Sequence, residues 1–182
     1  MAAIDKAGAA ERMVISAIMM AERGEDPLAI HVVAASALSI LRDLIDKAGQ
    51  DYVDQVLRIG AFTVASARVN GEPVMLPTNP GMDALVERVA CGIKVGEVTN
   101  ASDLIIGLTA AERRQLLNYI IQPYNFLKHA DRDPLATLDD SDIDPHGAIA
   151  HALTALGMVS PGKSLPDEIK PYLVRHHLSV PD

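Results

Sequence analysis

The sequence predicts an all-α fold, a single-domain helical bundle of five to seven helices covering residues 1–182. Hydrophobic residues make up 49% of the 182 residues, but aromatic residues make up only 3% and Trp is absent. The apolar residues are therefore mainly Ala, Leu, Ile, Val and Met, which pack readily along helices. In several segments they recur at spacings of three and four, and no segment shows the sustained alternation of a strand.

The first two helices are predicted from periodicity and end signals. Apolar residues spaced by three and four draw one stripe between Ile4 and Gly24, which is typical of an amphipathic helix. Asp26 precedes Pro27, so an acceptor side chain at the cap position is followed by proline at the first helical position. The second helix is expected to run to about Ala48 and to lie at the centre, because it is apolar on nearly every side.

Two more helices flank a segment that is rich in proline and glycine. We expect a third helix over 52–67 and a fourth over 82–96, with Cys91 as a small core residue of the fourth. Between them, "VNGEPVMLPTNPG" contains three prolines and two glycines. It predicts an extended loop around 69–81.

The next helix start is predicted from Thr109 and Glu112, which have capping-box spacing. Pro123 cannot donate a hydrogen bond to the preceding turn, so the helix is expected to kink there. The sequence then predicts a tilted segment over 124–130 with Phe126 and Leu127 turned into the core. Two short helices follow, one over 145–157 stopped by glycine and one near the C-terminus over 166–178.

Charge and composition restrict the partners and the compartment. A net charge of −8 would repel a phosphate backbone, which disfavours nucleic acid as a partner. The lone Cys91 cannot form an intramolecular disulfide, and Asp5 and Glu11 interrupt the region where a secretory signal would lie. The apolar stretch 27–41 is shorter than the roughly 20 residues of a membrane span. We therefore expect a cytoplasmic protein without a membrane partner.

The candidate ligand site lies directly after Pro123. Asn125 and His129 are four residues apart and share one helical face, and Lys128 lies at its edge. Together these three side chains could bind a small anionic ligand.

The same region offers a second interpretation as a metal site. His129 is followed by Asp131 and Asp133, and a histidine with carboxylates suits a divalent metal. For the acidic run 139–144, capping of the helix that follows and solvation are favoured over metal binding, since aspartates stabilise helix N-termini. Both interpretations are open at this level.

The segment "KAGAAERMVISAIMMAERGEDPLAIHVVAASALSILRDLI" resembles the opening helix pair of HEPN domains, which are helical bundles that usually dimerise. HEPN ribonucleases carry an Arg, often followed by Asn, and a His a few residues further on. "YNFLKHA" has Asn125 and His129 in suitable places, but Tyr124 stands where the Arg would be. The resemblance therefore implies a homodimer and a non-catalytic or nucleotide-binding relative.

Two functional hypotheses follow, and no complete catalytic motif decides whether the chain is an enzyme. The first is a soluble binding or regulatory module that receives a small anionic ligand or nucleotide near Asn125. The alternative is a metal-dependent hydrolase that uses the His/Asp cluster at 129–146, with His146 or His151 folded back onto His129 and a metal-bound water as nucleophile.

Overall fold

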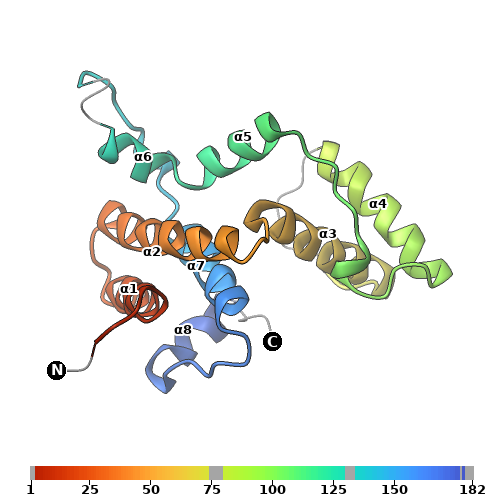
Figure 1. The fold of residues 1–182 in the computed structure, drawn as a ribbon, viewed down its shortest axis with the longest axis horizontal. Coiled ribbons are helices and arrows are strands. Elements are labelled where there is room, and N and C mark those ends of the chain that lie inside the picture. Colours follow the sequence, from red (N-terminus) through yellow and green to blue (C-terminus); the bar gives the residue numbers. More distant parts are fainter. Residues whose placement is uncertain (1–2, 74–79, 130–133, 177, 179–182) are drawn as a thin grey trace. The chain divides into compact units, whose positions relative to one another are not determined.

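The structure, a computed structural model, describes residues 3–73, 80–129, 134–176 and 178. These residues form α-helices and short 3-10 helices and no strand, which confirms the predicted all-α class (Figure 1). The described part contains eight α-helices where five to seven were predicted, because the kinked helix is in fact two. Their bounds are α1 Lys6–Glu22, α2 Pro27–Lys47, α3 Tyr52–Asn70, α4 Pro80–Val95, α5 Ala110–Ile120, α6 Gln122–Lys128, α7 Pro145–Val159 and α8 Lys170–Arg175.

The chain divides into two compact units. Unit 1 comprises Met1–Tyr52 together with Arg114–Asp182, and unit 2 comprises Val53–Arg113. Unit 1 thus contains α1, α2, α6, α7, α8 and residues 114–120 of α5, and unit 2 contains α4, all of α3 except Tyr52, and the first turn of α5. Whether the two units fold together as one domain over 1–182 stays a prediction.

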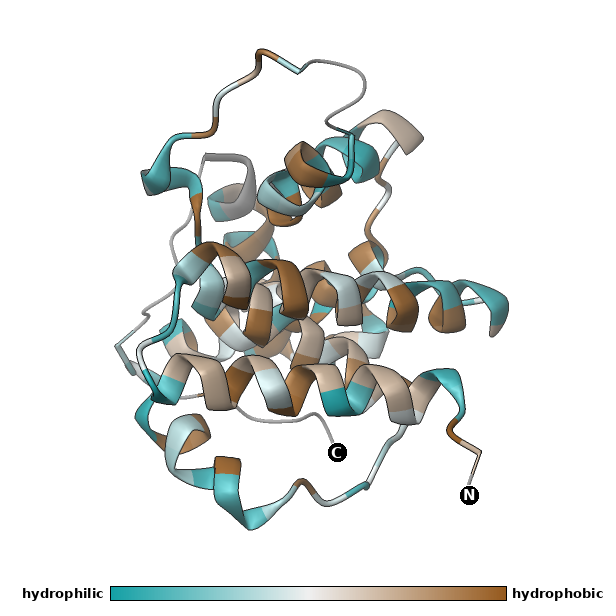
Figure 2. Ribbon diagram, turned by 90° about the vertical axis from the view of Figure 1, so that its left-hand side faces the viewer, coloured by the Kyte–Doolittle hydropathy of each residue, from teal (hydrophilic) through white to brown (hydrophobic). Residues whose placement is uncertain are grey.

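Unit 1 is built around α2, which packs against α1, α6 and α7. Asp26 caps α2 as predicted, because its carboxylate accepts a hydrogen bond from the Ala29 backbone N–H at 3.0 Å. Leu38 and Leu41, in the middle of the helix, are completely buried. Figure 2 shows hydrophobic residues along the helices and hydrophilic ones mainly in the turns and at the helix ends. The prediction that α2 is the central helix is therefore confirmed within unit 1.

α2 is longer than the apolar stretch that predicted it. With 21 residues it is the one helix in the described ranges whose length and composition would allow it to cross a bilayer. In the structure it instead buries Ile30, Ala34, Leu38 and Ile45 inside unit 1. A core helix passes the same test of length and hydropathy, and the observed packing is that of a core helix.

α7 begins where the sequence predicts and ends later. The Asp144 carboxylate accepts from the Gly147 N–H at 2.8 Å, so capping explains this member of the acidic run. Gly157 was expected to stop the helix, but α7 continues through it to Val159 and buries it. The prediction was wrong because the close packing of α7 in unit 1 offsets the backbone entropy of one glycine, about 1 kcal/mol.

The predicted break at Pro123 is present. α5 ends at Ile120, Ile121 has non-helical φ and ψ, and α6 starts with Pro123 in its first turn (Figure 1). The inward rotation predicted for Leu127 is wrong, because this side chain is 44% exposed. Pro123 is itself fully buried, and Ile121 is nearly so. The residues at the break are therefore more deeply buried than Leu127 in the turn that follows.

Unit 2 contains α3 and α4, which are joined by an ion-pair network. Arg68 on α3 donates to Asp83 at 2.8 Å and to Glu87 at 2.7 Å on α4. Cys91 was expected in the core of this unit but is exposed, because it lies on the face of α4 turned away from α3. Residues 74–79 of the predicted loop at 69–81 lie outside the described residues, and α3 and α4 take up its two ends. The buried cluster consists of Ala61, Val64, Ala65, Val86, Val89, Ala90 and Leu104.

Candidate functional site

The candidate site is a groove along α5 and α6, which we call the α5–α6 groove. Five of its polar side chains recur at spacings of three or four along the two helices. Its open volume is about 690 Å³. The lining residues are Gln115, Asn118, Gln122, Asn125, Phe126, His129, Thr137 and Leu138.

Local hydrogen bonds fix the segment that carries the groove. Thr109 and Glu112 form the predicted capping box at the start of α5, with the Thr109 N–H 2.8 Å from a Glu112 carboxylate oxygen and the Glu112 N–H 3.3 Å from the Thr109 hydroxyl. After the break, the Asn125 N–H donates to the Ile121 carbonyl at 2.9 Å, and the His129 N–H donates to Asn125 at 3.0 Å. The side chains of Asn125 and His129 are thereby held one turn apart.

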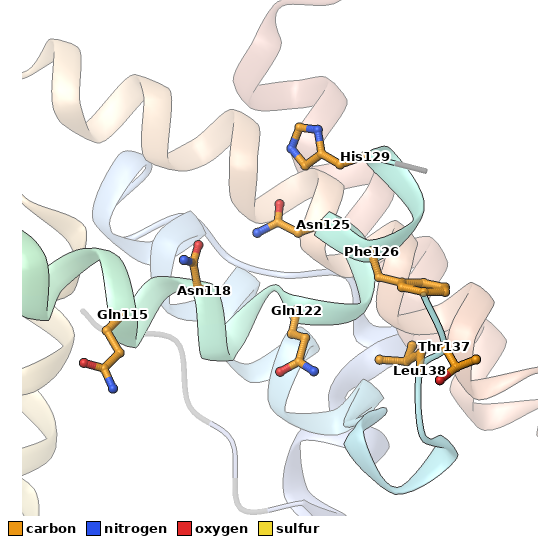
Figure 3. Close-up of a pocket in the computed structure, with 8 residues that line it drawn as sticks. All are labelled: Gln115, Asn118, Gln122, Asn125, Phe126, His129, Thr137 and Leu138. Atoms are coloured by element: carbon orange, nitrogen blue, oxygen red, sulfur yellow. The ribbon is translucent and has the colours of Figure 1, made fainter. Parts of the chain in front are cut away.

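Figure 3 shows how the lining side chains are arranged. Asn118, Asn125 and His129 project to one side of the helical face, and Gln115 and Gln122 project to the other. At the far end, the ring of Phe126 lies beside Leu138 and Thr137, which the chain brings back from the segment before α7. The groove is therefore an amide-lined surface with an apolar end.

The chemistry of the lining is almost entirely neutral. In the described lining His129 is the only ionisable side chain, and no Asp, Glu, Lys or Arg contributes. Each Asn or Gln amide both donates and accepts hydrogen bonds, so a row of them can pair with a ligand that presents donors and acceptors side by side. This arrangement suits polar recognition.

The three predicted ligand residues have different positions. Asn125 and His129 line the groove, as half-buried side chains, while Lys128 does not. The Lys128 ammonium lies 5.5 Å from the centroid of the Tyr124 ring, in a cation–π contact. One residue corresponds to about 100° of rotation around a helix, so Lys128 points away from the face that its neighbour His129 shares with Asn125.

The metal hypothesis is only partly covered by the structure. Asp131 and Asp133 lie outside the described residues, so their position relative to His129 is not part of the structure. Within the described ranges, no group of three His, Cys, Asp or Glu side chains is placed to hold a metal ion. In the acidic run, Asp139 accepts from the Ser141 hydroxyl and N–H, and these hydrogen bonds lower the pKa of Asp139.

His146 and His151 do not fold back toward His129 and instead pair with tyrosines. The His146 Nδ1 lies 2.7 Å from the Tyr172 hydroxyl, and burial raises the pKa of that tyrosine to about 12. The His151 Nδ1 lies 2.8 Å from the Tyr52 hydroxyl, and burial lowers the pKa of His151. Within unit 1, these contacts tie α7 to Tyr52, the first residue of α3, and to α8, which is a structural role.

Another histidine, His31, is buried on α2. Its Nδ1 lies 3.1 Å from the Asp144 carbonyl, and burial lowers its pKa, so the ring is neutral and Nδ1 donates. No hydrogen-bond partner of its Nε2 is found in the described part of unit 1. The contact fixes α2 against the start of α7.

Sequence analysis missed six of the eight groove residues, among them Phe126, which was expected in the core. The amides of Gln115, Asn118 and Gln122 continue the same three-and-four spacing as Asn125 and His129, and that spacing was a signal available in the sequence. Thr137 and Leu138 carry no such signal, because they reach the groove only through the fold.

Comparison with known proteins gives no relative from which a function could be transferred. No family model, curated protein or solved structure matches the chain.

Proposed function

We propose that this chain is a soluble, cytoplasmic binding or regulatory module that acts as a homodimer and receives a small anionic ligand of the nucleotide type in the α5–α6 groove. The observation that carries the proposal is the row of amides along α5 and α6, with His129 at its end. Asn and Gln side chains can form paired hydrogen bonds with the edge of a purine base, particularly adenine. His129 would then lie next to the phosphate.

The charges of the molecule favour a mononucleotide over a polynucleotide. A net charge of −8 opposes a long phosphate backbone, but it does so much less for one phosphate at the end of a neutral groove. A non-catalytic HEPN-like module would agree with the absence of an Arg before Asn125, because Tyr124 holds that position. The proposed role is therefore recognition of a ligand without its hydrolysis.

The experiment is a thermal-shift and calorimetric titration with adenosine, AMP and inorganic phosphate. A ligand at a hundred times its Kd should raise the free energy of unfolding by about 2.7 kcal/mol. We expect AMP to stabilise the protein most, and Asn125→Ala and Gln122→Ala to weaken binding about tenfold each, as the loss of a hydrogen bond of about 1.4 kcal/mol would. Gln50→Ala is the matched control, since it removes an exposed amide outside the groove.

The results separate the parts of the proposal. If none of the three compounds binds, the nucleotide proposal is wrong. If adenosine binds as tightly as AMP, the groove recognises the base and the anionic part of the proposal is wrong. If Gln50→Ala weakens binding as much as Asn125→Ala, the site is not the α5–α6 groove.

The alternative proposal is a hydrolase that binds a divalent metal through His129, Asp131 and Asp133. It is supported by the residue types alone. Elemental analysis of protein purified without a histidine tag, followed by titration with zinc, manganese and magnesium, tests it. His129→Ala should abolish metal uptake, and an unchanged uptake in that variant would refute the assignment.

A further inference from the structure

Unit 2 carries a second groove, which we call the α4 groove. It lies between α4 and the segment 97–105, which returns alongside this helix, and its open volume is about 490 Å³. Most of its lining is apolar, and two large side chains there are strongly exposed, with Val95 at 70% and Ile105 at 91%. The lining residues are Leu85, Arg88, Val89, Cys91, Gly92, Val95, Glu97, Val98, Asp103, Leu104 and Ile105.

The walls of the α4 groove are held in place by short-range contacts. A Cβ at Gly92 would lie 2.7 Å from a methyl carbon of Val98, so only glycine allows the return segment to approach α4 this closely. The Gly92 carbonyl accepts from the N–H groups of Glu97 at 2.9 Å and Val98 at 3.2 Å. The groove is therefore formed within unit 2 before anything occupies it.

The capping box at residues 100–103 fixes the far end of the return segment. The Asp103 carboxylate accepts from the Thr99 N–H at 2.8 Å and from the Asn100 N–H at 3.1 Å. These hydrogen bonds lower the pKa of Asp103 and use its oxygens locally. Glu97 is therefore the acidic side chain on this wall that is best placed to meet a partner.

The two walls of the α4 groove carry opposite charges. Arg88 lies on α4 and Glu97 lies on the return segment, and both side chains are exposed. In the described residues neither takes part in an ion pair. A surface that carries both signs across an apolar centre is self-complementary, because a two-fold axis brings each charge of one copy against the opposite charge of the other.

The buried cluster of unit 2 consists mainly of small apolar residues. In the described residues it contains three alanines, three valines and one leucine, and the larger side chains of Phe62, Leu85 and Ile93 are only partly buried against it. Val95 and Ile105 are exposed in one copy, so their burial against a second copy would add apolar contact. At about 25 cal/mol per Å² of buried apolar area, such contact is the main source of dimer stability.

We propose that the α4 groove is the homodimer interface of this protein, with Arg88 of each copy paired with Glu97 of the other across the apolar centre formed by Val95 and Ile105. The inference rests on the homodimer stated under the proposed function, and it names the surface that forms it.

Sedimentation velocity over a range of micromolar concentrations tests the dimer itself. We expect a concentration-dependent shift from the mass of one chain, 19.4 kDa, to twice that mass. Ile105→Asp should abolish the shift, because it places a charge in the apolar centre, while circular dichroism confirms that the variant is folded. A wild-type protein that stays monomeric throughout contradicts both the homodimer and the interface.

A charge exchange tests the interface. Arg88→Glu gives a copy with two acidic walls, and Glu97→Arg gives a copy with two basic walls, so each variant alone should dimerise at least about tenfold more weakly. An equimolar mixture of the two should form a heterodimer, because both cross pairs are then attractive. If the mixture dimerises no better than the separate variants, Arg88 and Glu97 do not face each other.

Cys91 supplies an independent readout. It is the only cysteine, it is exposed, and it lines the α4 groove, so a short bismaleimide can link two chains only through this position. We expect cross-linked dimer from the wild type and from the variant mixture, and little from Ile105→Asp. A wild-type dimer that sediments normally but neither cross-links nor responds to Arg88→Glu would show that the dimer forms through another surface.

Discussion

Unit 1 and unit 2 are built from the same kinds of aliphatic residue but bury them to different depths. In unit 1, α2 is enclosed by α1, α6 and α7, and long side chains such as Leu38 and Leu41 are completely buried. In unit 2, α3 and α4 enclose mainly Ala and Val, while Val95 and Ile105 stay exposed. A central helix needs neighbours on several sides, and unit 2 supplies only two long helices.

The two proposed binding surfaces also differ in their chemistry. The α5–α6 groove in unit 1 is polar and suits a small ligand, because amide side chains make up half of its lining residues. The α4 groove in unit 2 is apolar with charged walls and suits a protein surface. The following experiments test this contrast between a deep core and a shallow one.

The largest expected effect is the loss of a buried leucine from unit 1. Leu38→Ala should lower the free energy of unfolding by about 2–5 kcal/mol, the range for leucines in closely packed cores. Val89→Ala, at a buried position of unit 2, removes less side chain and should cost about 1–2 kcal/mol. Urea denaturation followed by circular dichroism measures both, and equal losses would contradict the contrast.

The second experiment uses pH. All six histidines lie in unit 1, and burial lowers the pKa of His31 and His151 below the ordinary value of 6.5. Below pH 6.5 the unfolded chain then binds more protons than the folded chain. The stability of unit 1 is therefore highest above pH 6.5 and falls as the pH drops toward about 5.

Unit 2 should not respond in the same pH range. The pKa of Asp103 is lowered from 3.8 by hydrogen bonds from Thr99 and Asn100, so its contribution is present above that value and is lost only in stronger acid. Hydrogen exchange at pH 7 and 5, corrected for the intrinsic pH dependence, compares the units. His151→Gln should reduce the response of unit 1, and an equal response of residues 53–113 would be evidence against the assignment to histidines.

A smaller effect is expected from the cap of α7. Asp144→Ala removes the acceptor for the Gly147 N–H and should lower the free energy of unfolding by about 1 kcal/mol. Asp144→Asn keeps an acceptor and should lose much less. The His31 contact uses the Asp144 backbone carbonyl and survives both changes. Thermal unfolding of the two variants distinguishes a cap from a charge effect, since equal losses would indicate the charge.

The smallest effect is expected from the ion pairs between α3 and α4. Arg68 donates to Asp83 and Glu87 at the surface of unit 2, where solvent screens the attraction. Arg68→Ala should therefore destabilise unit 2 less than Val89→Ala does, and the difference from the wild type should shrink as salt is added. A loss that is independent of salt would show that the arginine acts through packing.

The sequence by itself determined the helical class and most helix starts, because these depend on contacts within one turn. Asp26, Asp144 and the pair Thr109 and Glu112 each bond to a backbone amide three residues away, so spacing alone predicts them. The break at Pro123 is equally local, since proline lacks the amide hydrogen wherever it stands.

Tertiary structure decided which faces are buried and which distant residues meet. Leu127 and Cys91 are exposed, and α7 continues through Gly157. These features depend on what packs against each helix, which no local sequence pattern predicts. Tyr52 and His151 are 99 positions apart and still share a hydrogen bond. In the α5–α6 groove, the sequence supplied the amide row, and the fold added Thr137 and Leu138 by returning the chain to it.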